Sequence, residues 1–422
     1  MDHSLQRPIK TGISILRPWW DNHGAMALRL AVALMALVAF MWLGYEFWRL
    51  LWGSEPIWPS SPTGAIDLKL RYEEVHHWFV GKPVYGTLPG AIYPPASYAI
   101  LWPLLGWLSL TASRWLWAVM SVIALVWLIY LIIQESGADT PLESFFVALM
   151  PLSMYATGAT IGNGQLIVLI LPTILAGMLM LHRRQDRWSG DLLAAALVLM
   201  ALVKPSISVP FFWIVLFVPG RLRPALLVSL GYVALTLFAV SFQEATVFSL
   251  LRDWLTGSSG AGGIAGEANL HILLAALGLE EWILPASLLV LLTLGFWAYR
   301  YRQIDIWLLM GVTAIAARFW SYHRWYDDLL ILLPMVALFR IAKRGLSTDG
   351  SDVVAGVLLA ITLLAMMAPG GLYLFPPPWN NLYVSLQTIV WIIVLIFLLH
   401  QTGREQAQSS TKLLQVKSEG KL

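Results

Sequence analysis

Long apolar runs separated by short polar connections dominate the chain, and the first of them covers residues 26–52. Runs of about twenty mostly apolar residues predict helices that cross a lipid bilayer. Further crossings are predicted near residues 115–133, 144–159, 165–181, 191–203, 206–219, 224–242, 283–299, 304–320, 329–342, 353–368 and 383–400. The pattern therefore predicts an all-α polytopic integral membrane protein with about twelve crossings. Several runs are shorter than a usual span, which indicates that some helix ends line an aqueous cleft.

Basic residues in the connections predict how the chain is oriented. We expect each basic cluster to face the cytoplasm, and the clusters lie at residues 182–187, 221–223, 300–302 and 343–344. They share one side only if the short apolar segment 96–110 dips into the membrane and returns, or lies flat. Both termini are then cytoplasmic. We expect one membrane-embedded domain over residues 1–400 and a polar, disordered cytoplasmic tail over residues 401–422.

Composition supports the membrane class and excludes others. The chain is 58% hydrophobic and 12% charged, whereas a soluble domain carries about 25% charged residues. No cysteine is present, which excludes disulfides, thiolate nucleophiles and cysteine-ligated zinc. The formal charge of +3 does not indicate a nucleic-acid partner. Residues 1–20 lack the pattern of a cleavable signal peptide, so the first span is expected to remain as an anchor.

One polar stretch, residues 65–85, follows the first span and gathers carboxylates, imidazoles and amines. Charges exposed to lipid cost several kcal/mol each, so this stretch must lie outside the bilayer or line a wet cavity. We expect it to form an external catalytic loop, about residues 53–95, with an amphipathic helix on the membrane surface. Asp67 lies here beside Lys69 and Arg71. Nearby cations keep a carboxylate ionised, as a general base requires. The alternative is a surface aspartate paired with Lys69 or Arg71.

The predicted topology brings the other unusual polar residues to the same, non-cytoplasmic side as Asp67. Lys204 ends one apolar run before a proline, where it either binds an anion or extends to the interface. Asn163 and Gln165 lie in a glycine-bounded turn. Their amides are suited to sugar hydroxyls or a phosphate, or else they cap helix ends. The loop 243–271, with Asn269 and His271, ends on this side too.

Residues 321–328 form the second concentration of ionisable side chains, shortly after Arg318. His323 is suited to acid, base or hydrogen-bonding roles near neutral pH, and Arg324 to a phosphate. Trp325 or Tyr326 would stack on a sugar ring. The alternative is an interfacial aromatic belt in which Arg324 pairs with Asp327 or Asp328.

Motifs for metalloproteases, α/β-hydrolases and P-loop nucleotide binding are absent from the sequence. A metal site built from Glu73, Glu74, His76 and His77 is disfavoured, because consecutive residues on a helix point in different directions. We therefore expect no metal and no cofactor.

Taken in order, these short motifs resemble the GT-C glycosyltransferases that use polyprenol-phosphate sugars, in particular glycosyltransferase family 87 with its α-mannosyltransferases. The matching features are Asp67, Gly81–Tyr85, Tyr93–Pro95, Gly164–Gln165, Ala201–Pro205, Asn269 and Ser321–Asp328 followed by Leu329–Pro334. Two features depart from the family pattern. Ile167 stands where the family commonly has an asparagine, and the loop at 257–263 is unusually rich in glycine.

The resemblance implies a GT-C-like fold and an inverting transfer of a hexose, with mannose favoured, from a polyprenyl-phosphate sugar to a glycan or glycolipid. It implies that Asp67 is the base, with His323 sharing that role or binding phosphate, and that Lys204 and Arg324 hold the lipid phosphate. The remaining candidates for substrate binding are Tyr93, Asn163, Gln165, Asn269, His271, Arg318, Tyr326 and Asp327. The implied location is the cell (inner) membrane, with the site facing the periplasm or exterior. A polytopic transporter or lipid flippase is the competing class, but it would favour internal repeats and charges near the midplane, and neither is evident.

Overall fold

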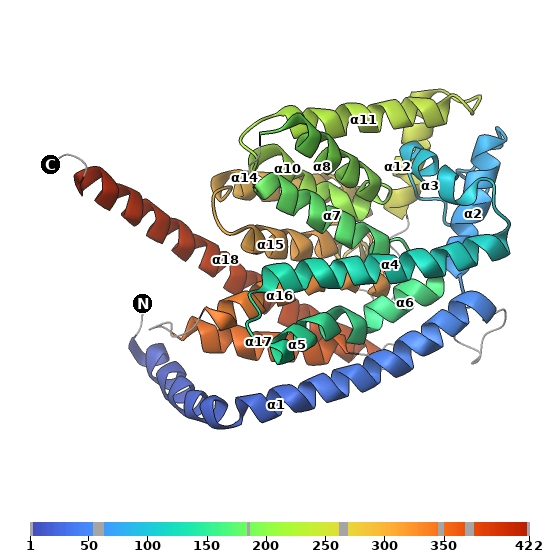
Figure 1. Cartoon of the computed structure of the whole chain (residues 1–422). Coiled ribbons are helices and arrows are strands. Elements are labelled where there is room, and N and C mark those ends of the chain that lie inside the picture. The colour runs from blue at the N-terminus through green and yellow to red at the C-terminus, as the bar shows by residue number, and fades with distance from the viewer. Residues whose placement is uncertain are drawn as a thin grey trace.

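The computed structural model describes residues 3–53, 63–183, 186–260, 269–344, 350–367 and 375–419, and these residues are mostly helical (Figure 1). The helices are α1 (His3–Trp52), α2 (Ile66–Phe79), α3 (Pro95–Leu105), α4 (Leu110–Ser136), α5 (Pro141–Ser153), α6 (Tyr155–Asn163), α7 (Ile167–His182), α8 (Trp188–Ala201), α9 (Pro205–Ser208), η1 (Val209–Phe211), α10 (Phe212–Phe217), α11 (Arg223–Val240), α12 (Val247–Gly260), α13 (Leu270–Ala276), η2 (Glu280–Trp282), α14 (Ile283–Arg300), α15 (Ile306–Phe319), η3 (Trp325–Ile331), α16 (Leu332–Lys343), α17 (Ser351–Met366) and α18 (Trp379–Glu419). The prediction of an all-α protein is confirmed over the described residues.

The interior consists of short helices that are apolar on every side. Most residues of α7, α15 and α16 are buried. A helix that is hydrophobic all round has no face to present to water and is stable only when other elements surround it. These three helices therefore form the centre, and the segments that carry the polar motifs follow directly from their ends.

Longer helices form the outer layer and expose apolar side chains. Five described helices are long and apolar enough to cross a membrane: His23–Trp52, Leu110–Ser136, Arg223–Val240, Glu280–Arg300 and Trp379–Gln408. Phe40, Val126 and Phe296 on them are each more than half exposed. Large exposed apolar surfaces of this kind are typical of a protein whose solvent is lipid. The protein is therefore a membrane protein.

The predicted count of about twelve crossings is not confirmed. The described helices include six candidate spans if the pair α6 and α7, bent by 117°, is counted as one. Most of the other predicted crossings correspond to apolar helices of 10–17 residues. Segment 96–110, expected to dip or lie flat, is the short helix α3.

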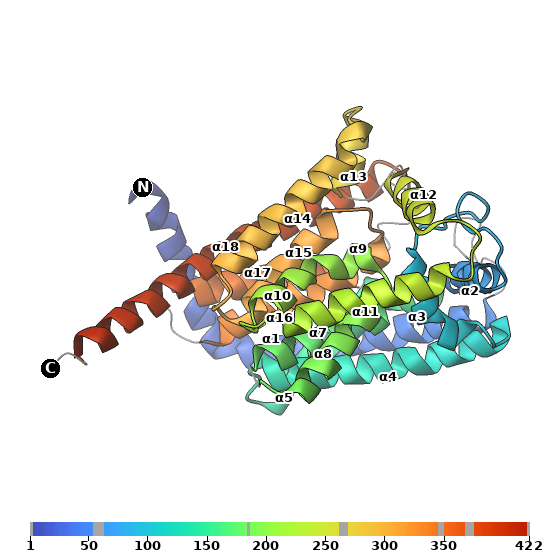
Figure 2. The ribbon, with the colours of Figure 1, turned by 90° about the horizontal axis from the view of Figure 1, so that it is seen from above.

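Both ends of the chain lie at the same end of the molecule, and α2, α3 and α12 lie at the opposite end (Figures 1 and 2). The expectation of a disordered tail from residue 401 is wrong as far as residue 419, because α18 continues to Glu419. Glutamine, lysine and leucine are common beyond residue 401 and no proline follows, so intrinsic helix propensity lets the helix propagate.

Candidate active site

The turn between α6 and α7 is packed against the beginning of α2. Ala65, with φ of 56°, precedes α2 and donates its N–H to the carbonyl of Gly162 at 2.8 Å. Gly164 ends α6 with φ of +71°, and a Cβ there would lie 2.4 Å from Cβ of Leu68. Only glycine combines this backbone conformation with so close an approach. The glycine turn thus fixes the position of the next residue, Gln165, relative to α2.

Asp67, in the first turn of α2, is half-buried and hydrogen-bonds the Gln165 side chain. Burial raises the pKa of the Asp67 carboxyl above its usual value, although the bond to Gln165 and then the charges of Arg71, Lys204 and Arg324 oppose the increase. A carboxylate with a raised pKa is a stronger base than one exposed to water. Its environment is therefore suited to proton removal.

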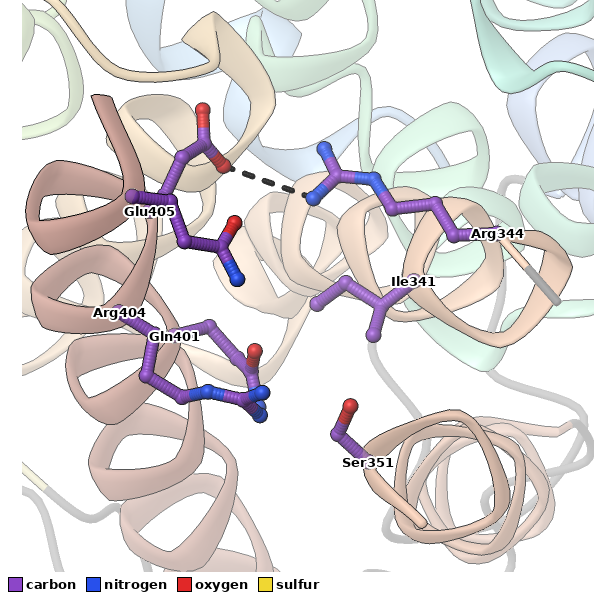
Figure 3. Close-up of a pocket in the computed structure, with 7 residues that line it drawn as sticks. Ile341, Arg344, Ser351, Gln401, Arg404 and Glu405 are labelled. Atoms are coloured by element: carbon purple, nitrogen blue, oxygen red, sulfur yellow. Dashed lines mark hydrogen bonds and ion pairs between the residues drawn. The ribbon is translucent and has the colours of Figure 1, made fainter. Parts of the chain in front are cut away.

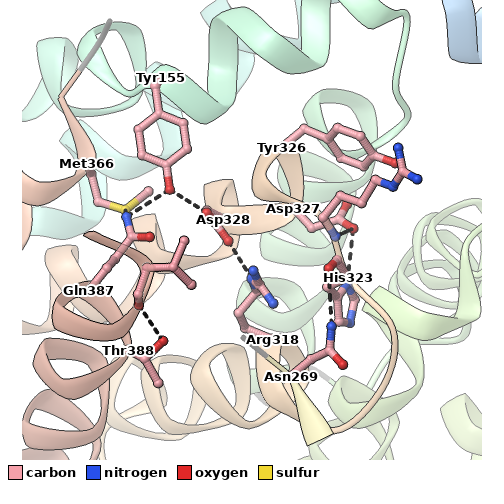
Figure 4. A network of polar contacts seen from close by, with 12 residues as sticks. Tyr155, Asn269, Arg318, His323, Tyr326, Asp327, Asp328, Met366, Gln387 and Thr388 are labelled. Atoms are coloured by element: carbon pink, nitrogen blue, oxygen red, sulfur yellow. Dashed lines mark hydrogen bonds and ion pairs between the residues drawn. The ribbon is translucent and has the colours of Figure 1, made fainter. Parts of the chain in front are cut away.

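Lys204 lies between α8 and α9 because Pro205 follows it. The residue before a proline avoids the helical region, and Lys204 has φ of −127° and ψ of 86°. Its Nζ contacts both carboxylate oxygens of Asp327, at 2.7 and 2.9 Å. His323 Nδ1 lies 3.1 Å from Oδ2 of the same carboxylate. Figure 4 shows the imidazole and carboxylate facing each other below Tyr326.

Charge balance within this group fixes the protonation states. Burial alone would raise the pKa of Asp327, but Lys204 and His323 lower it well below its usual range. Burial lowers the pKa of His323 in spite of the opposing effect of Asp327. The aspartate is therefore ionised and the imidazole neutral at pH 7. His323 is completely buried, whereas Asp67 retains access to solvent.

Two aromatic rings lie beside the cations of the site. Lys204 Nζ is 5.1 Å from the centre of the Tyr326 ring, and the Arg71 guanidinium carbon is 4.2 Å from the centre of the Tyr93 ring. Both tyrosines are nearly buried. Rings in this position stabilise a cation by contact with their negative faces. Together with Asp67, Gln165, Asp327 and His323, these residues assemble a site from α2, α3's leading segment, the α6–α7 turn, the α8–α9 junction and η3.

The family model of glycosyltransferase family 87 matches residues 91–338, more than half of the chain. The chain belongs to glycosyltransferase family 87. The matched stretch contains every predicted site residue except Asp67, which lies on the N-terminal side of it. No curated protein and no solved structure matches the chain, so the GT-C-like fold remains a prediction. Family membership favours the glycosyltransferase over the transporter or flippase.

The two arginines of the second polar motif have different surroundings in this glycosyltransferase. The Arg324 side chain donates to the hydroxyl of Tyr322, and only its backbone N–H contacts Asp327, at 3.4 Å. Arg318, 1% exposed, is paired with Asp328. Figure 4 shows Asp328 joined also to Tyr155, away from His323. Arg324 thus remains in the site region, whereas the placement of Arg318 favours a structural role.

Three other predicted ligands are held by neighbouring helices. Asn163 accepts a hydrogen bond from Arg49 at 2.8 Å. Asn269 caps α13 by accepting from Ile272 N at 3.0 Å, and its amide donates to the carbonyl of His323 at 3.4 Å. His271 Nε2 lies 3.0 Å from the Ser287 hydroxyl. Burial, and then the charge of His323, lower the pKa of His271 to about 4. These contacts hold the surroundings of the site in place.

Sequence reasoning did not identify two buried groups. Glu46 and Arg49 form an ion pair of 2.6 Å near the end of α1. The signal for it was present, because two charges three residues apart inside an apolar span require a partner. Arg71 is expected from the sequence to lie beside Asp67, as Lys69 does, but its burial is not, and it is 5% exposed. Burial of Arg71 depends on how α2 docks, which a single helical pattern does not specify.

A pocket of about 310 Å³ lies at the other end of the molecule, between the end of α16, the start of α17 and the second half of α18 (Figure 3). Its lining includes Arg344, Arg404 and Glu405. Arg344 is already paired with Glu405 at 3.5 Å and with Asp305 at 3.0 Å. None of the predicted site residues lines this pocket, so it is separate from the candidate active site.

Proposed function

We propose that this family 87 protein transfers a hexose, with mannose favoured, from a polyprenyl-phosphate sugar to a glycan or glycolipid acceptor, with inversion at the anomeric carbon. The observation that carries the proposal is the approach of one half-buried carboxylate, Asp67, to the cations of Lys204 and Arg324. A displacement of this kind needs a base on one side of the anomeric carbon and positive charge beside the departing phosphate. No nucleotide, metal or cofactor takes part.

In the proposed reaction, Asp67 removes the proton of an acceptor hydroxyl as its oxygen attacks the anomeric carbon. The bond from that carbon to the lipid phosphate breaks, and the phosphate leaves with the electron pair. Lys204 and Arg324 stabilise the charge that develops on it. Tyr93 and Tyr326 provide ring faces for the sugar. Gln165 orients the base through its hydrogen bond.

His323 is assigned to the donor side rather than to proton removal. It is completely buried and its Nδ1 is turned to Asp327. A neutral imidazole in this position holds the Asp327 carboxylate, which in turn holds Lys204. We therefore propose Asp67 as the base.

The arrangement of the polar segments supports a proposed location for the reaction. Both chain ends lie at one end of the molecule and α2 lies at the other (Figure 1). With cytoplasmic termini, the site faces the periplasm or exterior of the inner membrane, where lipid-linked donors are consumed without soluble nucleotides.

The test is a donor panel with protein purified in lipid nanodiscs. Polyprenyl-phosphate mannose and glucose are compared with the matching nucleotide sugars, and transfer to extracted glycolipids is followed by mass spectrometry. We expect transfer from a polyprenyl-phosphate hexose, unchanged by a chelator. Transfer from nucleotide sugars alone would refute the proposal. Movement of the intact lipid donor between leaflets without transfer would instead indicate a flippase.

Asp67→Asn tests the assignment of the base within that assay. Asparagine keeps the shape and one hydrogen-bonding oxygen but does not accept the proton, so we expect turnover to fall by about a hundredfold or more. Donor binding is expected to persist. Asp253→Asn is the control, because Asp253 on α12 is exposed and forms a weak surface ion pair with Arg252, at 3.7 Å. A rate near that of the unmodified protein would exclude Asp67 as the base.

A further inference from the structure

Helix α2 buries one row of charged side chains. Asp67, Arg71 and Glu74 are separated by four and three residues, so they lie on one face of the helix. Arg71 is 5% exposed and Glu74 1% exposed. On the opposite face Lys69 and Glu73 are exposed and 3.9 Å apart. A helix that only lies on a surface would place its ionised groups in water, so the buried row requires another explanation.

Arg71 is held from three directions. Its Nη2 lies 2.7 Å from Glu74 Oε1 and donates to the carbonyl of Gly90 at 3.0 Å. The guanidinium lies over the Tyr93 ring at 4.2 Å. Its Nη1 is buried and has no hydrogen-bond partner among the described residues. The result is a desolvated cation in a fixed position one helical turn from Asp67.

Other charged groups around Asp67 have partners of their own. Lys204 contacts both oxygens of Asp327, and the Arg324 side chain donates to Tyr322. Gln165 bonds Asp67 from the α6–α7 turn. Burial raises the pKa of Tyr93, before α3, and of Tyr326, in η3, and the charge of Asp67 adds to the increase in both.

Glu74 competes with Asp67 for the charge of Arg71. Burial raises the pKa of Glu74 to about 7, with the Arg71 charge opposing. A partly protonated Glu74 neutralises only part of the Arg71 charge near neutral pH, and the remainder acts on Asp67. Arg71 is the first of the cations that lower the pKa of Asp67.

We propose that Arg71 is a positioning residue that keeps Asp67 ionised, and that Glu74, at the other end of the row, sets how much of the Arg71 charge reaches Asp67. This inference rests on the proposed function, in which Asp67 is the base. It adds a charge row that tunes the base, built on one face of α2.

The two ends of the row predict opposite pH effects. Arg71→Gln removes the cation, so the pKa of Asp67 rises and the acidic limb of the pH–rate profile moves to higher pH. We expect about one unit, which is about a tenfold loss on the acidic limb and recovery at alkaline pH. Glu74→Gln removes the competing carboxylate, so the limb moves to lower pH. That shift is smaller, because Glu74 is already partly protonated there.

Two further variants separate charge from structure. Arg71→Lys keeps the cation but loses Nη2, which contacts both Glu74 and the Gly90 carbonyl, so we expect a lower rate with the limb near its original position. Lys69→Gln removes an exposed cation two residues from Asp67, and no shift is expected. A uniform loss at every pH in both Arg71→Gln and Glu74→Gln would show a structural role only, and it would overturn the inference.

A second measurement does not depend on turnover. Dicyclohexylcarbodiimide reacts with protonated carboxyls, and the stable adduct on the Asp67 peptide is quantified by mass spectrometry against pH, with Asp67→Asn as the blank. The midpoint is expected to rise in Arg71→Gln, fall in Glu74→Gln and stay constant in Lys69→Gln. An unchanged midpoint in Arg71→Gln refutes the inference even if transfer is observed. Shifted midpoints without transfer from any polyprenyl-phosphate sugar refute the proposed function and leave the charge row standing.

Discussion

Asp327→Asn tests whether the second polar motif is built around one buried charge. The carboxylate is 1% exposed and accepts from Lys204 at 2.7 and 2.9 Å and from the Arg324 backbone at 3.4 Å. His323 Nδ1 lies 3.1 Å away. Asparagine keeps one acceptor oxygen, but the negative charge of the carboxylate is lost. The NH2 group that replaces the second oxygen then faces another donor. Lys204 is then left as a nearly buried cation without a counter-ion.

The magnitude follows from that loss. Removing one partner of a buried ion pair costs about 3–5 kcal/mol, and the 9% exposure of Lys204 favours the lower end of this range. Lys204→Met in the same chain removes the orphaned charge, so the double variant is expected to recover about 1–3 kcal/mol relative to the sum of the single changes. Use of the sugar donor stays impaired in the double variant, because Lys204, the cation proposed to bind the donor phosphate, is absent.

The free energy of unfolding is measured by denaturation in mixed micelles, followed by the fluorescence of the 22 tryptophans. Asp253→Asn is again the control, with an expected change within about 0.5 kcal/mol for an exposed side chain. The reasoning fails if Asp327→Asn costs less than about 1 kcal/mol, as for a surface pair. It also fails if the losses of unfolding free energy in Asp327→Asn and Lys204→Met simply add up in the double variant.

Three further outcomes are expected. Lys204→Ala and Arg324→Ala raise the KM for the donor more than for the acceptor, because a charge-assisted hydrogen bond to phosphate contributes about 1.5–3 kcal/mol; equal effects on both substrates would indicate a structural role. Gly164→Ala lowers stability and the transfer rate, because Gly164 has φ of +71° and a Cβ there would lie 2.4 Å from the Cβ of Leu68. In the control Gly190→Ala the new Cβ has no atom within 4 Å, so stability and transfer rate stay unchanged. Equal thermal stability of the two variants would contradict this prediction. The transfer rate falls as pH drops through a midpoint above about 3.9, the value for an exposed aspartate, because the carboxylate and not the acid is the base; a pH–rate profile that is flat down to pH 4 contradicts it.

Sequence reasoning indicated which polar segments of the chain come close together. The basic connections placed Asp67, Lys204 and residues 321–328 at one end of the molecule, and in the structure their charges act on one another. The helix around Asp67 was also predicted, because it depends on the local pattern of the sequence. Local chemistry is readable from one sequence.

Sequence reasoning failed where the docking of one helix on another decides the outcome. Lys69 and Arg71 have similar chemistry and lie two residues apart, but the packing of α2 against α3, α4 and α6 buries one and exposes the other. The prediction of crossings from the length of apolar runs was not confirmed because it, too, ignores how helices pack on one another. Helices such as α15 and α16 are surrounded by protein, so they need not match the thickness of the bilayer.

Asp327 and Asp328 show most clearly why a motif does not specify its own roles. They are adjacent in η3, where about three residues complete a turn, so consecutive side chains point about 120° apart. One carboxylate therefore faces Lys204 and the other faces Arg318. Which of them enters the site is decided by the register of η3, that is, by its rotation about its own axis.

Asp328 is held by Tyr155, which also accepts from Gln387 on α18 at 2.8 Å. These partners are distant in the sequence, so the local motif does not reveal which aspartate faces Lys204. Asp328→Asn should therefore impair stability and the donor site together, whereas Gln387→Ala, which leaves both aspartates intact, should shift the donor KM only if this register is what positions Asp327. An unchanged donor KM in Gln387→Ala, with α18 still packed, would place the control of the register in Arg318 alone.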